Sequence, residues 1–215
     1  MHVKLFSRNL AIVLASAAIF LGGCSRSPSP RFYTLSPIQD QVASIRSSSG
    51  QNAVVGIGPV KLADYLDQSL IVSQTGDNQV VKAQFDRWVG PLKNNFVNVL
   101  ADNIGFLLPT NQIQLYPWRP DLPIDYQVTV DVARFDGRLG DAARLDSRWN
   151  ILKGPDKKLV RTGRSSISEP VTGPDYADLV AAQSRALGRL SQEIAQAIKG
   201  AGRHRAEVPG LNKED

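Results

Sequence analysis

Three stretches in the second half of the chain alternate apolar and polar residues, which is the period of a strand with one buried face. They cover residues 126–135, 142–152 and 158–168, and the connections between them, 136–141 and 154–157, are short. Connections of this length join neighbouring antiparallel strands, because parallel strands need a crossover of a dozen residues or more. The pattern therefore predicts an antiparallel meander with one polar face.

Two longer stretches repeat apolar residues every three or four positions, which is the period of an amphipathic helix. The first covers residues 85–108, but Pro91 is accommodated mainly in a first helical turn, so we expect regular helix over about 91–108. Trp88 is then expected to pack just before that helix.

The second helix is predicted from Tyr176 to about Lys199, and Gly200 and Gly202 are expected to end it because glycine is favoured just past a helix end. Its apolar positions share one face. The predicted buried stripe is Leu179, Val180, Ala186, Leu187, Leu190, Ile194 and Ile198.

Shorter elements are expected in the first half of the chain. In order, they are a strand over 32–35, a strand over 53–60 that ends in a turn at Gly58–Pro59, a helical turn within 61–68, a hairpin over 70–83 and a strand within 113–118. Together these elements predict an α/β fold: a single domain with a mixed β-sheet of six or seven strands, packed by two long helices. The predicted domain spans 32–200, and a polar tail spans 201–215.

The amino terminus has the pattern of a secretory signal. The basic residues Lys4 and Arg8 precede an apolar run from Leu10 to Leu21, and small residues follow it, as in a cleaved signal peptide. The run is too short for a transmembrane helix, which needs about 20 apolar residues. We expect residues 1–23 to be removed.

Cys24 is the only cysteine, and Leu21-Gly22-Gly23-Cys24 resembles the lipobox of bacterial lipoproteins. This resemblance implies a diacylglycerol on the Cys24 sulfur and a further acyl chain on its amino group, followed by a Ser/Pro linker over 24–31. Several acyl chains hold a protein on a membrane durably. The alternative is an ordinary secreted protein whose lone cysteine falls at this position.

Ser25 stands where lipoproteins retained in the inner membrane usually carry aspartate. The resemblance to that sorting rule implies an anchor in the outer membrane, facing the periplasm. An acylated Cys24 leaves no cysteine for a disulfide, so the domain must be stable through its core alone.

Charge and chemistry-bearing residues exclude several classes of function. The formal net charge is +5, but basic residues are interspersed with acidic ones, whereas nucleic-acid binding needs a clustered basic face. Of the two histidines, His2 leaves with the signal and His204 lies in the tail. The sequence gives no candidate catalytic residues, no metal ligands and no cofactor site.

Several segments together resemble the PqiC-type auxiliary lipoproteins of bacterial membrane-integrity (MCE) transporters, the ABC-type transport auxiliary lipoprotein family. The matching segments are Phe32–Leu35, Gly58–Asp67, Trp88 with Pro91-Leu92, Arg134–Gly137, Ser147–Trp149 and the last helix. The resemblance implies no enzymatic activity and no cofactor. It implies a lipoprotein that docks a periplasm-spanning MCE-domain protein, so that lipid passes between the membranes. Another lipoprotein that assists envelope assembly is the alternative, and a hydrolase is disfavoured.

Five arginines lie on the meander strands: Arg134, Arg144, Arg148, Arg161 and Arg164. If the strands pair as predicted, several of them share a face. They are either solvated surface or a contact with a partner, since arginine is enriched at interfaces. A homo-oligomeric ring around the partner's tip is one form of such a contact.

Overall fold

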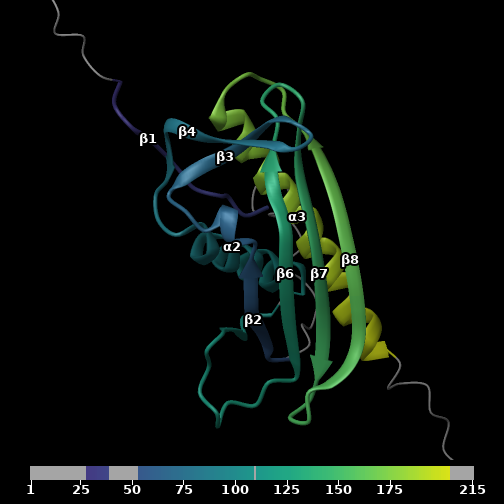
Figure 1. Ribbon diagram of the computed structural model, residues 1–215. Helices are drawn as coiled ribbons and strands as arrows, with labels where there is room; N and C mark the ends of the chain where they lie inside the picture. Colours follow the sequence, from purple (N-terminus) through teal and green to yellow (C-terminus); the bar gives the residue numbers. More distant parts are fainter. Residues whose placement is uncertain (1–27, 39–52, 109, 204–215) are drawn as a thin grey trace, which may run out of the picture. The chain divides into compact units, whose positions relative to one another are not determined.

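Figure 1 shows a computed structural model of the chain, which describes residues 28–38, 53–108 and 110–203. Among these residues, those from Arg31 to Arg203 belong to one compact unit. Cys24, the predicted signal peptide over 1–23 and the part of the predicted tail beyond Arg203 lie outside the described residues.

A five-stranded sheet is built around the meander. Its order is β5-β2-β6-β7-β8, in which β2 runs parallel to β5 and β6, and the meander strands are antiparallel. The strands are β2 (Val55–Leu62), β5 (Ile113–Leu115), β6 (Tyr126–Gly137), β7 (Ala142–Lys153) and β8 (Lys158–Pro170). The predicted fold class and the predicted meander are confirmed.

A second, three-stranded sheet has the order β1-β4-β3. It contains β1 (Arg31–Tyr33), β3 (Leu70–Gly76) and β4 (Gln79–Trp88), so the predicted hairpin is confirmed. The hairpin is longer than predicted. Its second strand, β4, continues to Trp88 through residues 85–88, which fit the helical period in the sequence. The eight strands of the described residues thus form two sheets rather than one.

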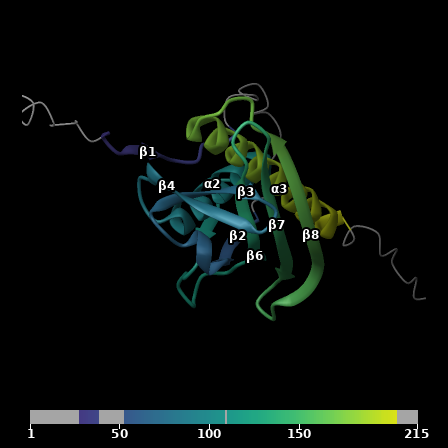
Figure 2. The same cartoon turned by 45° about the horizontal axis from the view of Figure 1, so that its top comes forward.

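Both long helices pack on the same side of the five-stranded sheet (Figures 1 and 2). They are α2 (Leu92–Leu107), which begins just after Pro91 as predicted, and α3 (Tyr176–Arg203). All members of the predicted stripe of α3 are buried. The prediction that Gly200 ends this helix was wrong: Ala201 still packs against the core, and glycine inside a helix costs only about 1 kcal/mol.

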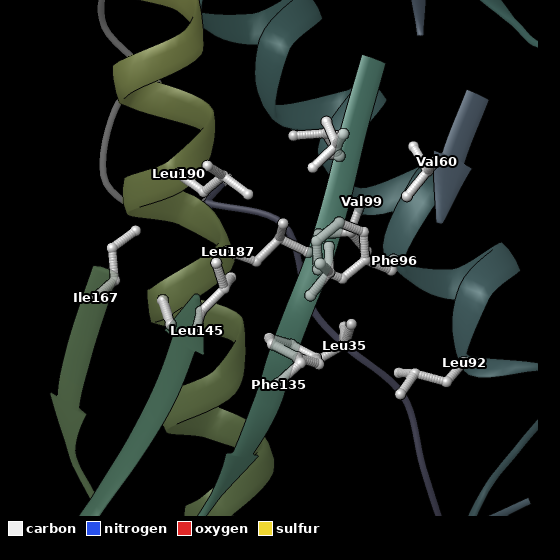
Figure 3. Packing of buried hydrophobic residues seen from close by; sticks show 14 of the residues in the cluster. Leu35, Val60, Leu92, Phe96, Val99, Phe135, Leu145, Ile167, Leu187 and Leu190 are labelled. Atoms are coloured by element: carbon white, nitrogen blue, oxygen red, sulfur yellow. The ribbon is translucent and has the colours of Figure 1, made fainter. Parts of the chain in front are cut away.

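The helices meet the sheet through large apolar side chains. Phe96 of α2 and Phe135 of β6 pack edge to face with ring centroids 5.2 Å apart, and Leu187 of α3 lies beside Leu145 of β7 (Figure 3). All four side chains are at most 1% exposed. Edge-to-face packing of two aromatic rings adds about 0.5–1.5 kcal/mol to the stability gained from their burial.

The turn predicted at Gly58–Pro59 does not end the strand. β2 passes through these residues to Leu62, and its register with β6 shifts between Ile57 and Val60. The shift is a β-bulge, which accommodates proline because the bulged residue needs no ladder hydrogen bond. The helical turn predicted within residues 61–68 is a single 3-10 turn, η2 (Asp64–Leu66).

A stability test follows from Trp149, whose ring lies over Gly163 on the neighbouring strand. A Cβ at Gly163 would lie 2.1 Å from Trp149 Cζ2, and the indole is held by a 2.9 Å hydrogen bond from its Nε1 to Ser165 Oγ. We expect Gly163→Ala to lower the free energy of unfolding by about 1–3 kcal/mol, as overpacked cores do. Urea unfolding of the unlipidated chain beginning at Ser25 measures it.

Gly76→Ala is the matched control, since Gly76 is also a strand residue and a Cβ there meets nothing within 4 Å. Its effect should stay within about 0.5 kcal/mol. Equal stabilities of the two variants would contradict the packing described for Trp149.

Candidate functional site

The polar face of the meander is the region to which sequence reasoning assigned a possible interface. Strand pairing places its residues in rows across β6, β7 and β8. The rows are Thr129–Asn150–Thr162, Asp131–Arg148–Arg164, Arg134–Asp146–Ser166 and Asp136–Arg144–Ser168. Four of the five arginines considered in the sequence, Arg134, Arg144, Arg148 and Arg164, therefore share this face. Arg161 does not, because it pairs with Ile151, whose side chain is in the core.

A second β-bulge, at Ala133 of β6, decides which residues reach this face. The register with β7 shifts between Val132 and Arg134, and Ala133 is exposed. Strict alternation would have placed Arg134 and Asp136 on the apolar face with Val132. The bulge adds one residue and thereby turns both side chains to the polar face.

Asp136 is the most deeply buried charge of this region, with no exposed side-chain surface. Its carboxylate accepts hydrogen bonds from Tyr65 Oη at 2.8 Å, from Arg134 Nε at 2.8 Å and from Gln74 Nε2 at 3.3 Å. Arg134 also donates to Gln74 Oε1. A buried carboxylate is tolerated only when its lone pairs are satisfied in this way, so Arg134 has a structural role in neutralising Asp136, and the exposed arginines of this face are Arg144, Arg148 and Arg164.

The same buried environment changes the pKa of Tyr65. Burial, followed by the hydrogen bond to Asp136, raises the pKa of the Tyr65 hydroxyl well above its ordinary value. The hydroxyl therefore keeps its proton, and with it the hydrogen bond, to high pH. Two segments of the family resemblance, Gly58–Asp67 and Arg134–Gly137, are thus joined by this contact.

Arg148 and Arg164 lie directly opposite each other on β7 and β8, and both are exposed. Side chains in this position are about 5 Å apart at Cβ, and like charges there are destabilising. Asp131 faces Arg148 from the other side but is not a neighbour of Arg164. Asp146 lies one row away, diagonal to Arg164, but neither member of the arginine pair, defined as Arg148 and Arg164, forms an ion pair within 4 Å among the described residues.

A second buried carboxylate fixes β1, the first strand of the three-stranded sheet. Asp86 of β4 is 4% exposed, and it accepts hydrogen bonds from Arg31 Nε at 2.7 Å and from Tyr33 Oη at 2.8 Å. Burial and this contact raise the pKa of Tyr33. Both ends of β1 are therefore held to β4 through Asp86.

Other candidate chemistry is limited within the described ranges. They hold no group of three His, Cys, Asp or Glu residues placed as metal ligands, and neither long helix there has the length and apolarity to cross a bilayer. Trp88 and Trp149, two aromatic residues of the resemblance, are core residues at 5% and 6% exposure. The lipidation site predicted at Cys24 lies outside the described residues.

The comparison with protein families identifies the domain. Residues 33–195 match the family described as ABC-type transport auxiliary lipoprotein component. The match begins in β1 and ends within α3, so it covers both sheets and both long helices. Most of the chain therefore carries the family's sequence pattern.

Among individual relatives, the intermembrane transport lipoprotein PqiC of Escherichia coli is 26% identical over 183 residues, which is 85% of this chain and 94% of the relative. PqiC of Shigella flexneri gives the same values. A crystal structure of a Xanthomonas campestris protein superposes with a TM-score of 0.67 at 16% identity, covering 83% of this chain and 99% of the other. This structural likeness shows the fold alone.

The Asp136 cluster, defined as Asp136 with Tyr65, Gln74 and Arg134, is tested by Tyr65→Phe. At pH 8 the variant should lose about 1.5–3 kcal/mol of unfolding free energy, the range for a hydrogen bond to a charged group. Guanidinium unfolding at a series of pH values, followed by far-ultraviolet circular dichroism, measures this difference.

The difference should shrink at high pH. Above about pH 10 the unfolded chain releases the Tyr65 proton while the native protein keeps it, because the native pKa is raised. The stabilisation is thus complete below about pH 10 and is lost as pH rises through the native pKa, at up to about 1.4 kcal/mol per pH unit. A constant difference between wild type and Tyr65→Phe up to pH 11.5 would contradict the cluster.

Proposed function

We propose that this chain, which belongs to the ABC-type transport auxiliary lipoprotein family, is anchored in the outer membrane through acylated Cys24 and docks the MCE-domain protein of its transporter. In this proposal the protein has no enzymatic activity. It holds the tip of a periplasm-spanning assembly against the outer membrane, so that lipid passes between the membranes. The similarity to a protein named as an intermembrane transport lipoprotein supports this role.

The length of the tether supports a local role at one membrane. β1 begins at Arg31 and is held there by Asp86, so the linker is limited to the six residues from Ser25 to Pro30. A Ser/Pro linker extends by about 3 Å per residue, which gives about 20 Å. A domain held this close to its membrane cannot itself cross the periplasm, and a longer partner has to do so.

The observation that carries the docking proposal is the arginine pair. Two exposed like charges held side by side cost stability in the free domain, and an acidic group on a partner would remove that cost on binding. Arginine is also the cation that pairs with carboxylates through two parallel hydrogen bonds. We therefore place the partner contact over Arg148 and Arg164, next to the exposed Arg144.

The anchor is tested by Cys24→Ala. Without the thiol no diacylglycerol can be attached, so we expect an uncleaved precursor that retains residues 1–23 and does not fractionate with the outer membrane. Mass spectrometry of the amino-terminal peptide and sucrose-gradient fractionation measure both effects. A wild-type chain that begins anywhere other than at an acylated Cys24 would overturn the anchor.

The docking surface is tested by Arg164→Glu. The new carboxylate faces Arg148, so the free domain should gain about 0.2–1 kcal/mol of unfolding free energy, while the contact with an acidic partner should weaken. A photo-cross-linking amino acid at the exposed Ser168, on the same face, reports that contact in cells. We expect at least a tenfold loss of the cross-link to the cognate MCE protein.

Arg161→Glu is the matched control, because Arg161 is exposed on the same strand but belongs to the opposite face. It should leave the cross-link unchanged. Cross-links to a second copy of this chain would assign the surface to a homo-oligomeric ring. Unchanged cross-links in Arg164→Glu would show that the arginine pair is solvated surface.

A further inference from the structure

A small pocket at the turn end of the meander combines charges of both signs. Its volume is about 170 Å³, and the charged and amide side chains that line it are Gln74, Asp77, Arg134, Arg138, Asp141 and Arg144. They come from the β3–β4 hairpin, the end of β6, the β6–β7 connection and the start of β7. Segments far apart in the sequence therefore build one site, which lies beside the Asp136 cluster but is distinct from the arginine pair.

Arg138 lines the pocket and forms only long ion pairs with its neighbours. Its Nη2 lies 3.5 Å from Asp77 Oδ1 and its Nη1 lies 3.6 Å from Asp141 Oδ2. Ion pairs with good hydrogen-bond geometry are closer, at about 2.7–2.9 Å. Its Nε is buried and has no hydrogen-bond partner among the described residues, which is an uncommon state for a buried polar atom.

The two carboxylates of the pocket are exposed. The side chain of Asp77 is 98% exposed and that of Asp141 is 54% exposed, while that of Arg134 is only 24% exposed. The carboxylates of Asp77 and Asp141 therefore lie toward solvent at the mouth of the pocket, whereas the Nε of Arg138 is buried. An exposed carboxylate at 3.5 Å contributes little to stability, so a ligand can displace it from Arg138 at small cost.

The charges of the pocket are balanced overall. Arg134, Arg138 and Arg144 face Asp77 and Asp141, and Asp136 lies behind Arg134. A plain anion gains from the guanidinium groups but is repelled by the exposed carboxylates at about the same range. A ligand that carries an anion at one end and a cation at the other satisfies both sets of groups.

We propose that this pocket binds a phosphate ester that also carries a protonated amine, of the phosphoethanolamine type. The phosphate accepts hydrogen bonds from Arg138 and Arg144, and guanidinium groups match phosphate oxygens in geometry. The ammonium group lies between Asp77 and Asp141 at the mouth of the pocket. A lipid headgroup and a free phosphate ester share this chemistry. The proposal does not depend on the docking role, which rests on Arg148 and Arg164; neither of these lines the pocket, although Arg144 lies between the two sites.

The test uses the full mature lipoprotein in a nonionic detergent, with ¹⁵N-labelled arginine, and follows the side-chain Nε–H resonances by NMR. The probes are glycerophosphoethanolamine, glycerophosphoglycerol, inorganic phosphate and ethanolamine. We expect a saturable shift of the Arg138 resonance with glycerophosphoethanolamine, and affinities at least tenfold lower for the two phosphates that lack an amine. Arg138→Gln should lower the affinity for glycerophosphoethanolamine at least tenfold, whereas Arg161→Gln should leave it unchanged.

Asp77→Asn separates this site from a simple phosphate site. Removal of the carboxylate should weaken glycerophosphoethanolamine binding and strengthen inorganic phosphate binding. The same shift in micelles doped with phosphatidylethanolamine, but not with phosphatidylglycerol, would assign the site to a lipid headgroup. A shift with the water-soluble ester alone would assign it to a free metabolite.

Two results would overturn the proposal. One is equal affinity for inorganic phosphate and glycerophosphoethanolamine, and the other is no Arg138 shift with any probe while the Nε–H resonance is visible. Neither result affects the cross-link to the MCE protein through the arginine pair, so failure of the pocket and failure of the docking role are distinguishable.

Discussion

A carboxylate with no exposed surface, that of Asp136, has to be neutralised in place, and the groups that do so come from three segments. Tyr65 belongs to η2, Gln74 to β3 and Arg134 to β6. An unpaired charge at this depth costs several kcal/mol, so the carboxylate holds the three-stranded sheet against the five-stranded one. The pocket at Arg138 is lined partly by the same Gln74 and Arg134, and its shape therefore depends on this cluster.

Elements that bury one continuous apolar face could be predicted from the sequence, because their period reports the buried side directly. The meander and the stripe of α3 are examples. Elements set by contacts between distant segments could not. β2 continues through Gly58 and Pro59 because β6 pairs with it beyond a bulge, and β4 reaches Trp88 because β1 pairs with Asp86 to Trp88. The three-residue spacing of Phe85 and Trp88 fits a helix as well as a strand end. The pairing with β1 is what makes this segment a strand.

In the candidate site, too, the sequence predicted only the residues that follow regular alternation. Alternation placed Arg144, Arg148 and Arg164 on one face, as the structure confirms. It could not place Arg134, because the bulge at Ala133 reverses the alternation. Arg161 and Arg164 are three positions apart, so alternation puts them on opposite faces, and the pairing of Arg161 with the buried Ile151 agrees. The pocket was missed altogether. Its signal in the sequence is only Asp77 in one turn and Arg138 with Asp141 in another, and nothing short of the fold brings those turns together.

The constraint on the inner face explains why both proposed sites lie on the outer one. Every residue of β7 that faces α3, from Ala143 to Ile151, is at most 6% exposed, and Trp149 leaves no space for a side chain at Gly163. A change on that face costs whole kcal/mol, whereas a charge on the polar face costs tenths. The polar face can therefore keep a like-charged pair and a loosely held arginine, both of which lower stability in the free protein. Function commonly costs some stability, and in this fold the alternation of the meander confines such costs to one face.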